Sequence, residues 1–161
     1  MSADPQQLLH VTIQDLPPFR VACFFCNLQL ATGQYSNQIQ QGFQQIKSWA
    51  LQRGLDLTRQ RIIGIPRVRD GQLTGYDCCV ELPENGVIDD NSFQMKQVSG
   101  GRYAVLLLEK NSAVIGAAIG RFFTEYAPAH RLVVDPQRFS YEVYDETFMT
   151  YFVPIHVITP G

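Results

Sequence analysis

The sequence predicts an α+β fold in which an antiparallel eight-stranded sheet carries two helices on one face. Three observations support this prediction. Eight short segments alternate between apolar and polar residues, or run apolar, in the manner of β-strands. Two longer segments repeat their apolar residues at helical spacing. The order strand, strand, helix, strand, strand occurs twice, at about residues 9–82 and 93–158, which indicates an internal duplication within a single domain, 1–161.

The first half begins with two strands separated by the helix- and sheet-breaking pair Pro17-Pro18. Further along, the apolar spacing becomes helical, and Gly54 stands where a glycine commonly ends a helix. Pro66 is expected to end the strand that follows. Strands are therefore expected at residues 9–16, 19–25, 61–65 and 76–82, and a helix at 36–53.

The second half repeats these signals. Gly100-Gly101 has the composition of a hairpin turn, Ser112 is a suitable N-cap, and Pro128 is expected to end the second helix. Strands are expected at residues 93–98, 103–109, 139–144 and 151–157, and a helix at 112–127.

Composition narrows the function classes. The 161 residues are 45% hydrophobic, which is enough to form a core without disulfides or metals. Thirteen Lys and Arg against 15 Asp and Glu give a net charge of −2, with no basic cluster. Direct nucleic-acid binding and membrane binding are therefore not expected, because both need a basic surface. The start of the chain lacks the pattern of a secretory signal, so a cytoplasmic location is expected.

The cysteines do not form a metal-binding pattern. The chain has four, at positions 23, 26, 78 and 79. The CxxC pair lies in a strand-like run, where residues three apart face opposite ways, so neither a metal site nor a cofactor is expected and the thiols are expected to be buried. Phosphate-binding loops and the GxSxG and HExxH motifs are absent as well.

One acidic residue stands out. Strand alternation places Glu142 on the same face as Tyr144, where a carboxylate beside an aromatic ring could attract a cation. A polar residue on the solvent face of a sheet would show the same pattern. Tyr35, Tyr76 and Tyr103 lie at strand ends or just before a helix, and each is open to interpretation as a core residue or as a ligand contact.

The chain resembles the GyrI-like small-molecule-binding domains, which also form the effector-binding part of multidrug-responsive AraC- and MerR-type regulators. The resemblance covers nearly the whole chain and rests on the order of seven short motifs. They are Arg20-Val21-Ala22, Gly33-Gln34-Tyr35, Gly42-Phe43 with Trp49, Tyr76-Asp77-Cys78-Cys79-Val80, Gly100-Gly101-Arg102-Tyr103-Ala104-Val105, Tyr141-Glu142-Val143-Tyr144 and Val153-Pro154-Ile155.

The resemblance implies two βαββ units in tandem with a pocket at their junction for hydrophobic, often cationic, compounds. It assigns Glu142 to the centre of that pocket and makes Tyr144, Tyr103, Tyr76 and Tyr35 candidates for its lining. Since no segment before Val11 is long enough for a helix-turn-helix, a stand-alone binding protein is expected, acting as a sensor or as a sequestering antidote.

Two other functions remain open from the sequence. The resemblance also implies a possible hydrolase of cyclopropane-containing electrophiles, an activity of some members of the family, in which Glu142 would activate water while Tyr103 protonates the leaving group. The domain could also inhibit or bind a larger protein. Whether it forms a homodimer is left open by the sequence.

Overall fold

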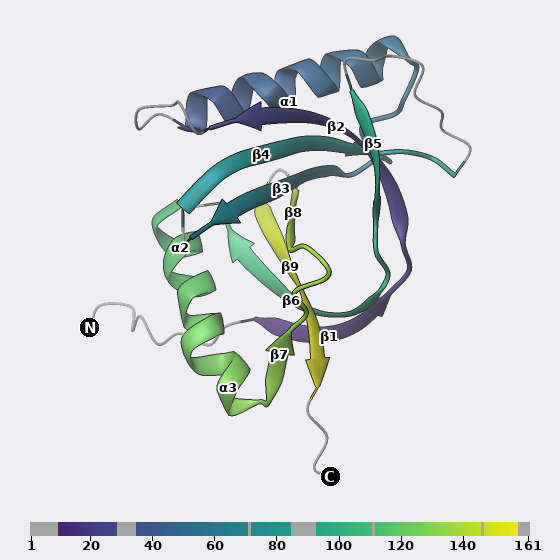
Figure 1. The fold of residues 1–161 in the computed structure, drawn as a ribbon. Coiled ribbons are helices and arrows are strands. Elements are labelled where there is room, and N and C mark those ends of the chain that lie inside the picture. Colours follow the sequence, from purple (N-terminus) through teal and green to yellow (C-terminus); the bar gives the residue numbers. More distant parts are fainter. Residues whose placement is uncertain are drawn as a thin grey trace.

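The computed structural model describes residues 10–28, 35–70, 72–84, 93–110, 112–145 and 147–157, and it confirms the α+β class. Eight strands form one curled antiparallel sheet, and two main helices pack against it (Figure 1). The strands are β1 Val11–Leu16, β2 Phe19–Asn27, β3 Ile62–Arg69, β4 Gln72–Glu81, β5 Gln94–Val98, β6 Gly101–Glu109, β8 Tyr141–Tyr144 and β9 Phe148–Val157. The main helices are α1 Tyr35–Gln52 and α2 Ser112–Arg121, and a short strand β7 Leu132–Val134 pairs with β9.

The strand order reveals the duplication. It runs β1-β6-β9-β8-β3-β4-β2-β5, which reads the same from either end when β1 is matched with β5, β6 with β2, β9 with β4 and β8 with β3. The two halves meet in the middle, where β3 pairs with β8. Each half also gives its first strand to the other, since β1 pairs with β6 and β5 pairs with β2.

This exchange corrects one sequence prediction. Gly100-Gly101 does turn the chain, but it does not close a hairpin, because β5 and β6 pair with other strands. The connection between β5 and β6, at Gly100, instead passes directly over the connection between β1 and β2, at Leu16–Pro18. A Cβ on Gly100 would lie 2.8 Å from the carbonyl oxygen of Leu16 and from two atoms of Pro18. Glycine is needed here because the two backbones touch.

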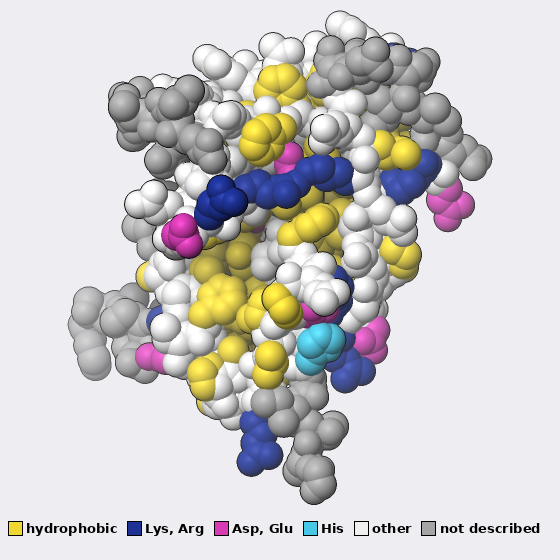
Figure 2. Space-filling view, viewed as in Figure 1, with side chains coloured by type: hydrophobic (Ala, Val, Ile, Leu, Met, Phe, Trp, Pro, Cys, Tyr) yellow, Lys and Arg dark blue, Asp and Glu magenta, His cyan; other side chains and the backbone are white. Residues whose placement is uncertain are grey.

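The sheet has apolar side chains on both faces. The inner face of the curl carries a cluster that includes Val21, Ile63, Tyr103, Tyr141 and Phe152. The other face carries two clusters, one under α1 over β2 and β4, and one under α2 over β6 and β9. Figure 2, drawn in the same orientation as Figure 1, shows apolar side chains gathered in the middle of this surface, below a band of basic side chains.

Several predicted element boundaries differ from the structure, two of them at prolines. β3 continues through Pro66 to Arg69, because β8 pairs only with Ile62–Gly64 and a proline is tolerated where a strand has one partner. The second helix continues past Pro128 to Ala129, through a π turn at Phe122–Tyr126 that widens the hydrogen-bond spacing just before the proline. The strand β7 was not predicted. Gly54 ends α1 with a φ of +78°, as expected.

Among the helices that the structure describes, none combines the length and the apolar character required to cross a bilayer.

The crossing of the two links gives a test of the strand exchange. Gly100→Ala should lower the free energy of unfolding by about 1–3 kcal/mol, the usual range for forcing an atom into occupied space. Gly116→Ala is the matched control, because a Cβ there meets nothing within 4 Å and alanine in a helix should raise the free energy of unfolding by about 0.5–1 kcal/mol. Urea titration of both variants measures the two values. Equal stability of the two variants would contradict the close crossing.

Candidate functional site

The central pair of strands brings an acidic group and two hydroxyl groups together. Glu142 lies on β8 opposite Gly64 of β3, on the sheet face that carries the helices. Tyr144 donates a hydrogen bond of 2.7 Å to Oε1 of Glu142. Tyr76 reaches across from β4 and donates to the same oxygen, and its hydroxyl lies 2.9 Å from that of Tyr144. The cluster therefore takes Tyr76 from the first half of the chain and the other two residues from the second.

Gly64 makes the approach of Tyr76 possible. A Cβ at position 64 would lie 2.6 Å from Cζ of the Tyr76 ring and closer still to its hydroxyl. Any side chain there would push the hydroxyl away from Glu142. Sequence analysis did not single out Gly64, although a lone glycine inside the apolar strand Ile62–Ile65 is a known sign of a close approach.

Burial controls the protonation of this cluster. Glu142 is partly buried, and desolvation raises the pKa of its carboxyl group above the usual 4.5, although the hydrogen bonds from Tyr144 and Tyr76 act in the opposite direction. Burial and the neighbouring carboxyl group raise the pKa of Tyr76 and of Tyr144 far above the ordinary tyrosine value. Both hydroxyls therefore keep their protons and act as donors.

A cavity of about 510 Å³ opens beside this cluster. Tyr144 belongs both to the hydrogen-bonded cluster and to the cavity wall. Phe43 of α1 also lines the cavity, and its ring packs edge-on against two tyrosine rings, with centroid distances of 5.7 Å to Tyr144 and 5.9 Å to Tyr76. The wall combines apolar, amide and basic side chains. It is lined by Ile39, Gln40, Phe43, Gln44, Lys47, Ile62, Lys110 and Tyr144.

The structure brings together three of the five predicted site residues: Glu142, Tyr144 and Tyr76. Tyr103 is separated from them, which corrects its expected grouping with Glu142. It lies on the inner face of the sheet, where its hydroxyl donates to the carbonyl oxygen of Ser99 and Arg138 lies 5.0 Å from its ring. Tyr35 begins α1, but its side chain lies outside the described residues.

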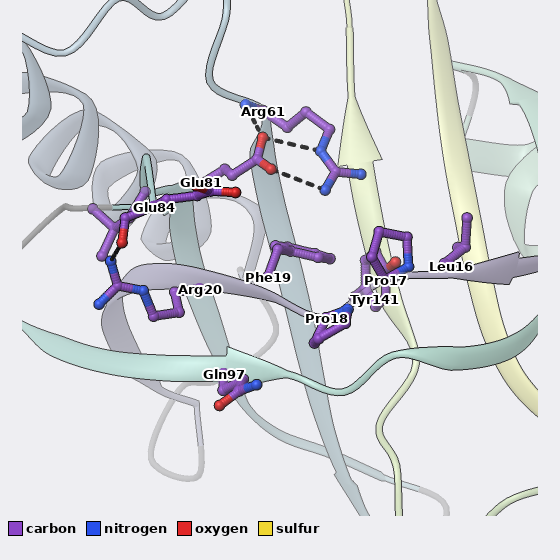
Figure 3. A pocket seen from close by; sticks show the side chains of 11 residues that line it. Leu16, Pro17, Pro18, Phe19, Arg20, Arg61, Glu81, Glu84, Gln97 and Tyr141 are labelled. Carbon is purple, nitrogen blue, oxygen red and sulfur yellow. Dashed lines mark hydrogen bonds and ion pairs between the residues drawn. The ribbon is translucent and has the colours of Figure 1, made fainter.

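A second cavity, of about 440 Å³, opens on the inner face near the crossing links (Figure 3). Two of the charged residues that line it, Arg61 and Glu81, form an ion pair with each other. Arg61 donates three hydrogen bonds of 3.1–3.2 Å to the carboxylate of Glu81, and its guanidinium lies 4.3 Å from the Phe19 ring. Arg61 and Glu81 already satisfy each other's charge, and Glu142 lies on the opposite face of the sheet from this second cavity. The cavity lined by Tyr144 is therefore the better candidate site.

The four cysteines are buried free thiols, as predicted. Sγ of Cys26 lies 3.9 Å from Sγ of Cys78 beneath α1, and desolvation raises the pKa of the Cys78 and Cys79 thiols. Thiols that hold their protons are poor nucleophiles and poor metal ligands. Within the described parts of the chain, no three His, Cys, Asp or Glu side chains gather in a way that could hold a metal ion.

Comparison with known proteins gives consistent results. The model of the GyrI-like small molecule binding domain matches residues 10–157. A Bacillus subtilis (strain 168) relative is 31% identical over 124 residues, covering 73% of this chain and 77% of that protein; it is the SPbeta prophage-derived protein YosT, named as a candidate transcriptional regulator.

Two solved structures share the fold at low identity. The C-terminal domain of EcmrR has a TM-score of 0.68 at 9% identity, covering 94% of this chain and 100% of that chain. SAV2435, solved bound to tetraphenylphosphonium, has a TM-score of 0.59 at 11% identity, covering 91% of this chain and 94% of that chain.

The raised pKa of Glu142 predicts how stability changes with pH. Between pH 4.5 and the raised value, the folded protein holds a proton that the unfolded chain has released, so the free energy of unfolding falls as the pH rises through this window. The Glu142→Gln variant has no ionisable group at this position. The stability of the wild type relative to Glu142→Gln should therefore decrease as the pH rises above 4.5, and then level off.

Urea titrations at a series of pH values measure this difference. Gln52→Ala, at an exposed position on α1, changes no titratable group, so it serves as the control and should keep a constant difference in stability from the wild type across the series. A wild type that gains stability relative to Glu142→Gln over the same window would show that the carboxyl group is held ionised instead.

Proposed function

The chain belongs to the GyrI-like small-molecule-binding domain family, and from that membership we propose that it binds a lipophilic small molecule in the cavity beside Glu142. One observation carries the proposal. A partly buried carboxyl group is held by two tyrosyl hydroxyls, and one of these tyrosines, Tyr144, also lines a cavity with apolar, amide and basic side chains in its wall. Small-molecule sites typically combine apolar lining with polar groups at fixed positions.

The wall and the carboxyl group have different roles in this proposal. Phe43, Ile39, Ile62 and Tyr144 provide apolar area, which gives most of the affinity when a lipophilic molecule leaves water. Glu142 provides orientation, because it can accept a hydrogen bond, donate one when protonated, or pair with a cation when ionised. A cationic group close to Glu142 would lower its pKa and replace the proton, so binding of such a ligand would release a proton.

The same binding step would serve a sensor or a protein that sequesters a toxic compound. The relative named as a candidate transcriptional regulator supports the sensor role. In either role the protein must hold the ligand without changing it.

Hydrolysis is the second candidate function, and the contact between a carboxyl group and two tyrosyl hydroxyls favours it. With Tyr103 on the other face, Tyr144 would take its place as the proton donor to the leaving group, and Glu142 would accept a proton from the attacking water. The raised pKa of Tyr144 makes it a weak acid, however. Binding without turnover is therefore the function that the geometry supports better, and formation of a ring-opened product from a cyclopropane-bearing compound would reverse that preference.

The apolar wall can be tested with N-phenylnaphthylamine, a neutral compound whose fluorescence increases when it leaves water. The wild type should bind it with a stoichiometry of one. Phe43→Ala removes the ring that touches both tyrosines and should weaken binding about tenfold or more. Phe25→Ala is the matched control, since Phe25 is half exposed on β2 and does not line this cavity. Equal loss in both variants would place the dye elsewhere.

The role of Glu142 can be tested with tetraphenylphosphonium, the cation bound to a protein of the same fold. Glu142→Gln keeps the shape and removes the ionisable group, so it should weaken binding by about 1–3 kcal/mol, the usual range for a lost charge-assisted contact. Isothermal titration calorimetry measures the change. Unchanged affinity would remove Glu142 from the binding site.

A further inference from the structure

The lysines of this chain are unevenly placed. The chain has only three, and its net charge is −2. Lys96 pairs with the buried carboxylate of Asp77 at 2.8 Å. The other two, Lys47 and Lys110, both line the candidate cavity. An acidic chain has therefore placed two of its three lysines around one opening.

These two lysines come from different halves of the duplication. Lys47 lies on α1 and Lys110 directly follows β6. Both side chains are exposed, and neither forms an ion pair with another described residue. Of the eight described residues that line the cavity, none is acidic. Two ammonium groups at one opening repel each other and repel cations, so the opening attracts an anion.

Two described carboxyl groups, those of Asp145 and Glu142, interact with residues of the cavity wall. Lys110 helps to lower the pKa of Asp145, but that carboxylate is turned to the backbone, where it accepts hydrogen bonds of 2.8 Å and 2.6 Å from the N–H groups of Thr147 and Phe148. Glu142 does not itself line the cavity, but its carboxyl group is hydrogen-bonded to Tyr144, which does, and to Tyr76. Neither carboxyl group closes an ion pair with the lysines.

We propose that the ligand of this cavity is an amphiphile with an anionic group at its outer end, which binds Lys47 and Lys110. This inference rests on the proposed function. The apolar body of the ligand lies against Phe43 and Tyr144, and its sulfonate, carboxylate or phosphate group binds the ammonium groups of Lys47 and Lys110. The charges at the opening thus select against simple lipophilic cations.

Three probes of different charge test the inference. N-phenylnaphthylamine is neutral, anilinonaphthalene sulfonate has the same ring skeleton with one sulfonate, and tetraphenylphosphonium is a cation. The wild type should bind the sulfonate at least fivefold more tightly than the neutral dye, and this preference should shrink as salt is added. In the double variant Lys47→Gln/Lys110→Gln, the sulfonate should lose its fivefold or greater advantage over the neutral dye, and the cation should gain affinity relative to the neutral dye.

A charge variant elsewhere on the surface is the control. Arg59→Gln removes an exposed basic group that does not line the cavity, and it should leave all three affinities unchanged. If the neutral dye binds but the sulfonate gains nothing, or if its gain survives in the double variant, the inference is wrong and the proposed function stands. If the neutral dye does not bind at all, the proposed function fails, and the inference fails with it.

Discussion

Three oxygen atoms at the junction of the two halves set the character of this domain. Oε1 of Glu142 is within hydrogen-bond distance of the Tyr76 and Tyr144 hydroxyls, which are also within hydrogen-bond distance of each other. Two tyrosyl protons can fill only two of these three contacts. Both tyrosyl protons go to Glu142. These two hydrogen bonds favour the ionised carboxylate, whereas burial favours the protonated carboxyl group and is the larger effect, so the pKa of Glu142 is raised.

The exchange of first strands explains why such a cluster can exist in a small domain. β1 and β5 each pair with the other half, so the halves are linked at both edges of the sheet as well as at its centre. β3 and β8 are therefore held in register, and Gly64 stays opposite Glu142. The register leaves room for the Tyr76 ring over Gly64. A buried polar cluster needs this precision, because a carboxyl group that loses its partners there would be left without compensation.

The sequence could predict what depends on neighbouring residues. Strand alternation correctly placed Glu142 and Tyr144 on one face, and helical spacing located α1. Neither pattern could show that Tyr76 donates a hydrogen bond to Glu142, because the two residues are 66 positions apart in the chain and meet only through the pairing of β3 with β8. Tyr103 was misplaced for a related reason. Alternation separates the two faces of a strand, but it does not show which face lies under the helices.

The same limit applies to the charges around the cavity. Lys47 and Lys110 look like ordinary surface residues in the sequence, and only the fold brings them to one opening. The net charge of −2 led only to the prediction that the chain binds neither nucleic acids nor membranes directly. At physiological salt, charges are screened over about 8 Å, so the charges far from a ligand matter less than those within a few ångströms of it. In the proposed binding mode, the charged groups nearest to the ligand are therefore the ammonium groups of Lys47 and Lys110 in the cavity wall, and Glu142 acts through its hydrogen bond to Tyr144.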